Sequence, residues 1–402
     1  MNKSIIHRES YFEYIAPYIG NSLIKVLIGQ RRVGKSYILF QLMEEIRKES
    51  PDTEIIYINK EDFAFVHIKD TATLINHIEA KGPASSKKAI FIDEVQEIEG
   101  FEKALRSLQL NSNYDIYCTG SNATMLSGEL ATYLAGRYIQ IRVYALTYEE
   151  FLLFHQLSDS NESFTKYLKY GGMPHLVNLK NEERIYYEYL RNVFDTIVLR
   201  DIVTRFKVRN VHFLNNLIQF IADNIGCVVS AKRISDYLKS QNIQLLPKLV
   251  LEYMYYLETV FFVERVKRTD VNGRKIFEIG DKFYFEDLGM RHALIPYQQK
   301  DVNKILENVV YHHLRARRYE VRIGKYGEKE IDFVAQKNGK TTYIQVTYLI
   351  TDEQTHNREF GNLLLIPDNN RKIVVSMDPL SGNEYKGIEH WPIRDFLLNR
   401  DF

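Results

Sequence analysis

The first third of the chain alternates between short apolar runs and longer amphipathic stretches. Runs rich in β-branched residues predict strands, and apolar residues three or four positions apart predict helices between them. The predicted strands are 24–28, 54–59, 87–94, 115–119 and 138–143. Helices are expected directly after the first strand and near 71–78. Strands that alternate with helices favour an α/β fold with a mainly parallel sheet, which binds ligands at the carboxyl ends of its strands.

The rest of the chain has a more helical pattern. Amphipathic helices are expected from residue 149 and over 182–203. Residues 211–285 predict three helices and then a hairpin, an order that resembles a winged helix. Near the C-terminus, a helix that ends close to Tyr319 precedes three strands, at 320–323, 330–335 and 342–347.

Length, charge and cysteines narrow the class of protein. The 402 residues are enough for two or three domains. Because 53 basic residues balance 52 acidic ones, a polyanion such as DNA could be held only by a local basic face. Cys118 and Cys227 lie in apolar stretches, which favours buried thiols and fits a reducing compartment. The N-terminus lacks the apolar core of a signal peptide, so we expect a cytoplasmic protein without a membrane partner.

Candidate chemistry begins directly after the first strand. The G-x-x-x-x-G-K-[ST] pattern of a phosphate-binding loop (Walker A) is matched by Gly29-Gln30-Arg31-Arg32-Val33-Gly34-Lys35-Ser36. The glycines permit close backbone approach, and Lys35 supplies a charge for the β- and γ-phosphates. The hydroxyl of Ser36 is suited to bind Mg²⁺. The loop, with Tyr37 in the next helix, predicts a nucleotide site at a helix N-terminus.

A second motif lies at the end of the third strand. Ile90-Phe91-Ile92-Asp93-Glu94 is an apolar strand that ends in two carboxylates, which is typical of Walker B. Asp93 is expected to hold Mg²⁺, and Glu94 to act as the base that deprotonates the attacking water. Acidic residues can also simply mark a strand end, and Walker A alone could be a glycine turn. The two motifs together favour nucleotide chemistry.

Two further positions are candidates for contact with the phosphates. Ser121, with Asn122 next to it, follows a strand and is predicted to sense the γ-phosphate or the attacking water; capping of the next helix is the alternative. Arg137 is predicted to be an arginine finger or phosphate sensor, because a guanidinium neutralises charge spread over several oxygens. A surface salt bridge is the alternative for Arg137. Both are expected at or just after the carboxyl ends of strands.

The C-terminal quarter has the order of helix and strands of a PD-(D/E)xK nuclease, but it lacks two of the residue types that catalysis needs. Glu307 lies in the predicted helix and Asp332 in the second strand. The third strand carries Gln345 and Thr347 where the pattern has a carboxylate and a lysine. A neutral amide adds no charge to a metal site, and threonine supplies no ammonium group. We therefore expect a catalytically degenerate domain; the alternative is a lysine that has moved to another position, Lys325 or Lys329.

Basic residues provide two candidate contacts for DNA. The hairpin of the winged-helix-like region carries Lys267, Arg268, Arg274 and Lys275. The helix and strand of the nuclease-like region carry Arg315, Arg317, Arg318 and Arg322. Either set could grip phosphates. A packing module and a solvated helix end are the respective alternatives.

Together these motifs resemble the archaeal-ATPase-like branch of the AAA superfamily. The other strings that carry the resemblance are Thr119-Gly120-Ser121-Asn122, Leu134-Ala135-Gly136-Arg137, Tyr170-Gly171-Gly172-Met173-Pro174 and Lys282-Phe283-Tyr284-Phe285-Glu286-Asp287-Leu288-Gly289-Met290-Arg291. The resemblance covers nearly the whole chain. It implies an ATPase domain, a winged helix and a C-terminal domain of unknown function with a nuclease-like fold. The chain departs from the family's usual E-x-K ending.

These observations predict four segments: a P-loop AAA-type ATPase domain at 1–147, a helical region at 148–210, a winged-helix-like domain at 211–290 and a restriction-endonuclease-like domain at 291–402. The expected function is binding and hydrolysis of MgATP, coupled to motion of the C-terminal modules. Lys35, Glu94, Ser121 and Arg137 would have the catalytic roles. The alternatives are a slow nucleotide-gated switch that docks DNA or a protein partner and, last, an active nuclease.

Overall fold

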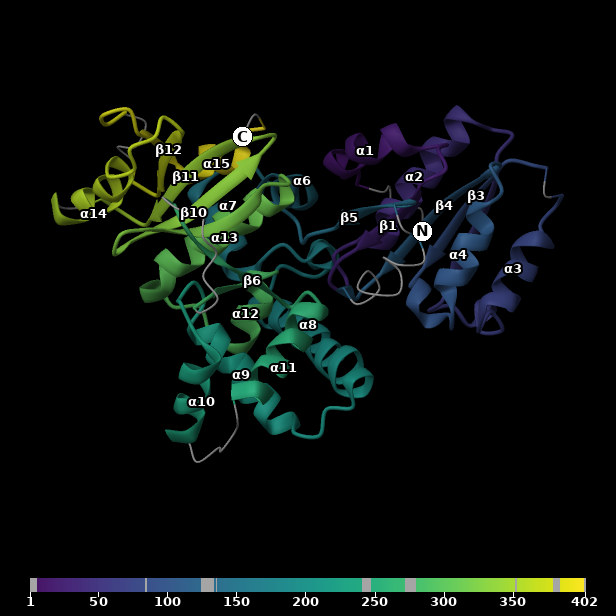
Figure 1. Cartoon of the computed structure of the whole chain (residues 1–402), viewed down its shortest axis with the longest axis horizontal. Helices are drawn as coiled ribbons and strands as arrows, with labels where there is room; N and C mark the ends of the chain where they lie inside the picture. The colour runs from purple at the N-terminus through teal and green to yellow at the C-terminus, as the bar shows by residue number, and fades with distance from the viewer. Residues whose placement is uncertain are drawn as a thin grey trace. The chain divides into compact units, whose positions relative to one another are not determined.

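The chain divides into two compact units (Figure 1). The computed structural model describes residues 6–83, 85–123, 134, 136–240, 247–271, 280–350, 353–378 and 384–400. The first unit comprises residues 1–143 with 259–261, and the second comprises 144–258 with 262–402. Within the described ranges, no helix is both long enough and apolar enough to cross a membrane.

The first unit is built on a five-stranded sheet with strand order β2-β3-β4-β1-β5. All neighbouring strands are parallel. The strands are β1 (Ile24–Ile28), β2 (Glu54–Asn59), β3 (Lys88–Asp93), β4 (Tyr114–Gly120) and β5 (Tyr138–Arg142). Every residue of β1 and β3 is buried, as expected for strands that are covered on both faces. The predicted parallel α/β sheet is confirmed.

Helices cover both faces of this sheet. α2 (Lys35–Glu49) follows β1, whereas α3 (Thr71–Glu79) and α4 (Phe101–Gln109) follow β2 and β3. The chain crosses the sheet in one direction after β1 and in the other after β2 and β3, so right-handed connections put α2 on one face and α3 and α4 on the other (Figure 1). The shorter elements are α1 (Glu9–Ile15), η1 (Ala16–Tyr18), η2 (Phe63–Phe65) and η3 (Val95–Glu97).

The second unit begins with helices. They are α6 (Tyr148–His155), α7 (Asn161–Tyr170), η5 (Pro174–Asn178), α8 (Glu183–Thr196), the π-helical η6 (Ile197–Thr204), α9 (Val211–Asp223), α10 (Ala231–Ser240), α11 (Pro247–Thr259), α12 (Leu288–Leu294) and η7 (Gln299–Asp301). Two segments far apart in sequence meet here, because Asp287 Oδ2 accepts the N–H of Gly172 at 2.6 Å. A Cβ on Gly289 would lie 2.0 Å from the carbonyl oxygen of Tyr170, so only glycine permits this approach.

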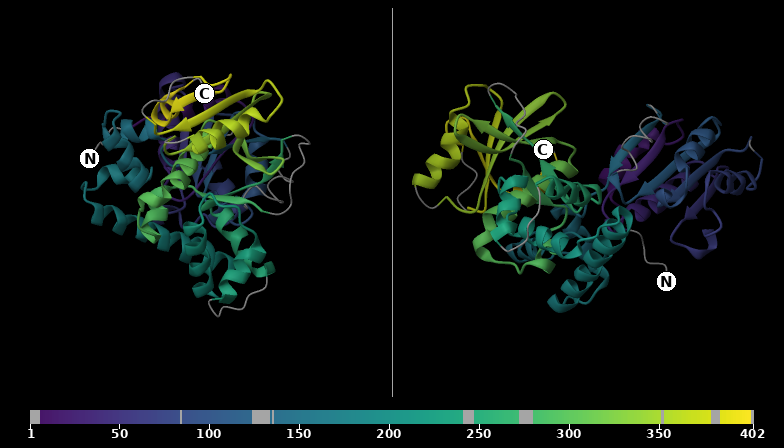
Figure 2. Two further views of the ribbon diagram at one scale, coloured as in Figure 1. Left: turned by 90° about the vertical axis from the view of Figure 1, so that its left-hand side faces the viewer. Right: turned by 60° about the horizontal axis from the view of Figure 1, so that its bottom comes forward.

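The second unit also contains a six-stranded sheet, in the order β13-β12-β11-β10-β9-β7. Its C-terminal part is coloured green to yellow in Figure 2. β9 (Glu320–Tyr326), β10 (Lys329–Lys337) and β11 (Lys340–Thr347) are antiparallel. β12 (Arg371–Ser376) and β13 (Glu389–Pro392) continue the sheet in parallel. The helices of this part are α13 (Val302–Ala316), α14 (Glu353–Leu364) and α15 (Ile393–Leu398).

The described strands of the predicted hairpin belong to two different sheets. β6 (Val263–Val266) pairs antiparallel with β8 (Lys282–Phe285), as expected for the base of a hairpin. β7 (Arg268–Asp270), however, pairs in parallel with β9 and extends the larger sheet. The backbone groups of β7 therefore find hydrogen-bond partners that sequence pattern alone did not indicate. Arg274 and Lys275 lie outside the described residues.

Candidate functional site

The predicted phosphate-binding loop lies between β1 and α2, at the carboxyl edge of the parallel sheet. Gly34 has a φ of 98° and precedes α2, whose first N–H groups have no side-chain cap. These N–H groups and the helix dipole are available to an anion. Gly29 has no room for a side chain, because a Cβ would lie 2.2 Å from the carbonyl oxygen of Val143. The predicted order of strand, loop and helix is confirmed.

An arginine outside the motif holds this loop. Arg8 is buried just before α1, and its Nη1 donates a hydrogen bond to the carbonyl oxygen of Val33 at 3.0 Å. Its backbone N–H donates to Oε1 of Gln41 in α2 at 3.2 Å. The two contacts tie the loop and the helix to the N-terminal segment. Sequence reasoning missed Arg8, because a lone arginine before a helix belongs to no motif.

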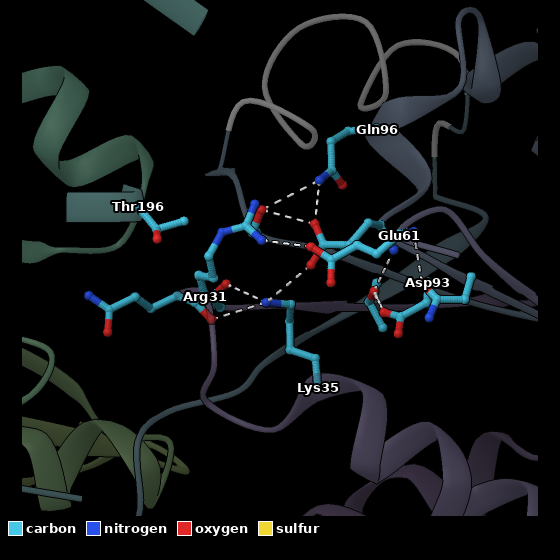
Figure 3. Close-up of polar contacts among 12 residues, drawn as sticks. Arg31, Lys35, Glu61, Asp93, Gln96 and Thr196 are labelled. Carbon is cyan, nitrogen blue, oxygen red and sulfur yellow. Dashed lines mark hydrogen bonds and ion pairs between the residues drawn. The ribbon is translucent and has the colours of Figure 1, made fainter. Parts of the chain in front are cut away.

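Lys35 binds to the loop itself (Figure 3). Its Nζ donates to the carbonyl oxygens of Gly29 at 2.9 Å and Gln30 at 3.0 Å, and lies 3.8 Å from Oε1 of Glu94. Burial lowers the pKa of Lys35, and the carboxylates of Glu94 and Asp93 offset part of that shift. Phosphate oxygens are stronger acceptors than carbonyl oxygens and could replace them.

Asp93, at the end of β3, is held by hydroxyl groups from both neighbouring strands. Thr119 of β4 donates to Oδ1, and Tyr57 of β2 donates to Oδ2 at 3.1 Å. Burial raises the pKa of Tyr57, and the charge of Asp93 raises it further, so the phenol stays a protonated donor. Both hydroxyls were missed, although polar residues at the ends of strands next to Walker B were a usable signal.

Glu94 is oriented by its backbone and by two donors. It adopts a left-handed conformation (φ 56°, ψ 53°), and its N–H donates to Oγ1 of Thr119 at 2.9 Å. Its Oε2 accepts hydrogen bonds from Oγ of Ser121 at 3.0 Å and from Nε2 of Gln96 at 2.5 Å. Burial alone would raise the pKa of Glu94, but the charge of Lys35 and the bond from Gln96 lower it. The carboxylate is therefore ionised.

The other predicted nucleotide-binding residues divide between buried and exposed positions. Gln30 and Val33 are buried, and neither side-chain polar atom of Gln30 has a hydrogen-bond partner in the part of the chain that the structure describes. Arg31 is also buried and forms an ion pair with Glu61 at 2.8 Å (Figure 3). Of the rest, Arg32 and Tyr37 are exposed, Ser36 is half-buried and Asn122 is buried.

Arg137 lies at the opposite end of the sheet from the loop. It precedes β5, and the parallel register pairs Ile28, the last residue of β1, with Arg142. The expectation that Arg137 lies at the phosphate end is therefore wrong, because the strand begins after this residue instead of ending there. Arg142 occupies that end. Its guanidinium carbon lies 3.6 Å from the ring centre of Phe261, and its charge acts on Lys35.

A second polar cluster lies in the second unit. Lys282 of β8 is buried, and its Nζ lies 2.6 Å from Oε1 of Glu307, 2.8 Å from Oε1 of Glu330 and 3.7 Å from Oδ1 of Asp332. Burial alone would lower the pKa of Lys282, but these carboxylates raise it. The pKa of Asp332 is raised by burial and by the charge of Glu307. Glu307 and Asp332 are thus brought together, around a lysine that sequence reasoning missed.

The nuclease-like positions on β11 have structural partners. Gln345 accepts the N–H of Asp332 at 2.8 Å and donates to Oε2 of Glu359 at 3.0 Å, so it links β10 to α14. Thr347 is buried two residues further along the same face of the strand. Among the residues described, no group of three or more His, Cys, Asp or Glu side chains is arranged to hold a metal ion. The lysine at the carboxylates is Lys282, not Lys325 or Lys329.

Three of the four arginines in the expected basic cluster of the second unit are paired with carboxylates. The ion pairs are Arg315–Glu264 at 3.3 Å, Arg317–Glu149 at 3.0 Å and Arg322–Glu320 at 2.5 Å. Paired guanidinium groups attract a polyanion less strongly than unpaired ones, since the neighbouring negative charges cancel much of the local potential. The cluster is therefore a weaker DNA contact than its sequence predicts.

Two family profiles match the chain. A profile described as an AAA domain matches residues 21–152, which contain both Walker motifs. A profile described as a domain of unknown function (DUF8612) matches residues 161–301. The first match agrees with the geometry of the phosphate-binding loop.

Relatives and solved structures extend the comparison. An uncharacterized protein of Haemophilus influenzae is 37% identical, over 99% of this chain and 100% of that protein. An uncharacterized protein of Methanocaldococcus jannaschii is 28% identical, over 82% of this chain and 75% of that protein. The solved structure of a Walker-type ATPase of Pyrococcus abyssi matches 72% of this chain and 95% of its own, with a TM-score of 0.51 and 13% identity. This last similarity shows a shared fold.

Proposed function

We propose that this protein, which belongs to the same family as the Haemophilus influenzae relative and contains an AAA domain, binds MgATP and hydrolyses it. The observation that carries the proposal is the meeting of Lys35 and Glu94, whose charged groups lie 3.8 Å apart at one edge of the sheet. A cation for phosphate and a carboxylate base are thus presented together. The uncapped N-terminus of α2 and the cradle at Gly29 fit the same triphosphate.

The roles of the residues follow from their places in the site. Lys35 and the N–H groups of the loop bind the phosphates. Ser36 and Asp93 would hold Mg²⁺, which would neutralise charge on the β- and γ-phosphates. Glu94 takes a proton from a water molecule whose oxygen attacks the γ-phosphorus. The bond between that phosphorus and the oxygen of ADP breaks, which releases ADP and phosphate. Arg142 adds a second cation at the same edge.

In this proposal, hydrolysis in the first unit moves the second unit. The support is the covalent connection between the two units. β5 ends at Arg142, and the next residue, Val143, donates its N–H to the carbonyl oxygen of Ile28 at 2.7 Å and faces Gly29 with its own carbonyl oxygen. The second unit starts at Tyr144. A change in the loop would therefore reach the connecting chain directly.

Two substitutions test the ATPase proposal. Lys35→Ala is expected to weaken binding of a nonhydrolysable ATP analogue at least about tenfold, because it removes the charge that holds the phosphates. Glu94→Gln is expected to keep binding and to lower phosphate release about a hundredfold, the usual effect of losing a general base. Lys48→Ala, at an exposed position of the same helix, is the control. Unchanged turnover in either site variant would contradict the proposal.

A second candidate function is a slow nucleotide-gated switch that docks DNA or a protein partner. It is supported by the cluster around Lys282, where an ammonium group already lies beside Glu307 and Asp332. In this proposal the C-terminal part keeps a nuclease-like fold without a metal, which suits docking more than cutting. Phosphate release would be measured with and without duplex DNA. No effect of any polynucleotide would contradict the DNA version, and Mg²⁺-dependent cutting that Asp332→Ala abolishes would establish a nuclease instead.

A further inference from the structure

Gln96 forms a closed set of hydrogen bonds with Glu94 and Ser121 (Figure 3). Its Nε2 donates to Oε2 of Glu94 at 2.5 Å and to Oγ of Ser121 at 3.4 Å. The hydroxyl of Ser121 donates to the same carboxylate oxygen at 3.0 Å. The orientation of the amide is fixed by chemistry, since its oxygen would be repelled by the carboxylate.

Only one end of the Gln96 amide group is hydrogen-bonded. Its Oε1 is buried and has no hydrogen-bond partner among the described residues. A buried carbonyl oxygen without a donor is unfavourable, so the bonds of the amide nitrogen alone hold the side chain at the carboxylate. The contact is also local, because Gln96 lies on the short helix η3 two residues after Glu94. Such a contact can open without rearrangement of the sheet.

These contacts occupy one oxygen of the carboxylate that the proposed reaction needs. Oε2 of Glu94 accepts two donors, and Oε1 lies 3.8 Å from Nζ of Lys35. A general base must direct a lone pair at the water that it deprotonates. In the described arrangement the lone pairs of Oε2 point at Gln96 and Ser121 instead.

We propose that Gln96 and Ser121 form a latch that holds Glu94 away from the attacking water until nucleotide is bound. The proposal rests on the ATPase function proposed above. Ser121 links the two states, because a hydroxyl has one proton and can donate to one strong acceptor at a time. When an oxygen of the γ-phosphate accepts the hydrogen bond of that hydroxyl instead, Glu94 keeps only the bond from Gln96 and turns to the water. Gln96 is thus a positioning residue, not a group that touches the reacting atoms.

The test is Gln96→Met, which keeps the length of the side chain and removes the amide. We expect kcat to rise about fivefold, the effect on a barrier of one lost hydrogen bond, while the Kd of a nonhydrolysable ATP analogue stays unchanged. Gln140→Met, on the exposed face of β5, is the matched control and should leave both values unchanged. A purely structural role would lower kcat or weaken binding.

The outcomes separate this inference from the proposed function. If the wild type exceeds Lys35→Ala in turnover but Gln96→Met does not exceed the wild type, the latch is wrong and the ATPase proposal stands. If neither the wild type nor Gln96→Met exceeds Lys35→Ala, both proposals are wrong. A rise in kcat with unchanged Kd, seen with Gln96→Met and not with Gln140→Met, supports the latch.

Discussion

The hydroxyl group of Thr119 donates a hydrogen bond to Oδ1 of Asp93 and accepts the backbone N–H of Glu94 at 2.9 Å. One side chain on β4 therefore fixes the carboxylate of Asp93 and the backbone of Glu94. Because the contact crosses from one strand to the next, it depends on the parallel register that pairs Ile92 with Cys118. The same residue connects the proposed magnesium ligand to the proposed base.

Removal of that hydroxyl should impair turnover. Thr119→Val keeps the shape of the side chain but takes a donor from Asp93 and an acceptor from the N–H of Glu94, at a cost of about 1–3 kcal/mol. We expect kcat to fall roughly tenfold and the Mg²⁺ concentration for half-maximal phosphate release to rise. Thr165→Val, at an exposed position of α7, is the control. An unchanged Mg²⁺ dependence would show that Thr119 does not orient the ligand.

Gly29→Ala should damage the loop. Its Cβ would lie 2.2 Å from the carbonyl oxygen of Val143, so the backbone of β1 or β5 must move. We expect a loss of about 1–3 kcal/mol in the free energy of unfolding of the first unit, together with weaker binding of an ATP analogue. Gly361→Ala in α14 is the matched control, because nothing lies within 4 Å of its Cβ and alanine favours a helix. An equal free energy of unfolding and equal binding of the ATP analogue in the two variants would contradict the clash.

Arg137, which precedes β5, and Arg142, which ends it, should differ in their effects. Arg142→Met removes a cation from the phosphate end of the sheet, and we expect binding of an ATP analogue to weaken about tenfold. Arg137→Met changes an exposed side chain at the other end and should leave binding in the same chain unaltered. Isothermal titration calorimetry with the ATP analogue measures the Kd of each variant. A larger effect of Arg137→Met would mean that this residue reaches a nucleotide held by another copy of the chain.

Lys282 should be important for stability of the second unit. Lys282→Met leaves Glu307, Glu330 and Asp332 close together without their cation, and breaking a buried ion pair in this way typically costs about 3–5 kcal/mol. Urea unfolding can be followed by the fluorescence of Trp391, the single tryptophan, which lies in the second unit. Lys325→Met is the control, because Lys325 pairs with the exposed Glu328. If Lys282→Met leaves the urea midpoint of unfolding unchanged, this lysine does not stabilise the second unit.

The pH dependence of stability should include a contribution from Glu258. Burial raises the pKa of Glu258 to about 7, from an ordinary value of 4.5. The folded chain therefore binds this proton more tightly than the unfolded chain, and stability is lost as pH rises from 4.5 to about 7. Glu258→Gln should be at most about 3 kcal/mol more stable than the wild type above pH 7, with little difference below pH 4.5. The free energy of unfolding of both proteins is measured with urea across this pH range. A difference between them that does not change with pH would contradict the contribution of Glu258.

The sequence by itself determined the features that depend on residues close together in the chain. Apolar runs and helical spacing predicted the five strands of the first unit and its helices α2 and α3, although not α1 or α4. The glycine loop between β1 and α2 identified the proposed phosphate site. Lys35, Asp93 and Glu94 could be named because their motifs combine a local conformation with a required chemistry. The hydrogen-bond partners of these residues belong to no motif.

Only the tertiary structure decided those partners, because they come from segments that are remote in sequence. Strand order put Tyr57 and Thr119 on either side of Asp93, and strand direction put Arg142 instead of Arg137 at the phosphate end. Lys282 reaches its carboxylates because β8 lies against a helix and a strand that follow it in the chain. Register and burial set these contacts, and neither is encoded in the spacing of residues within one element.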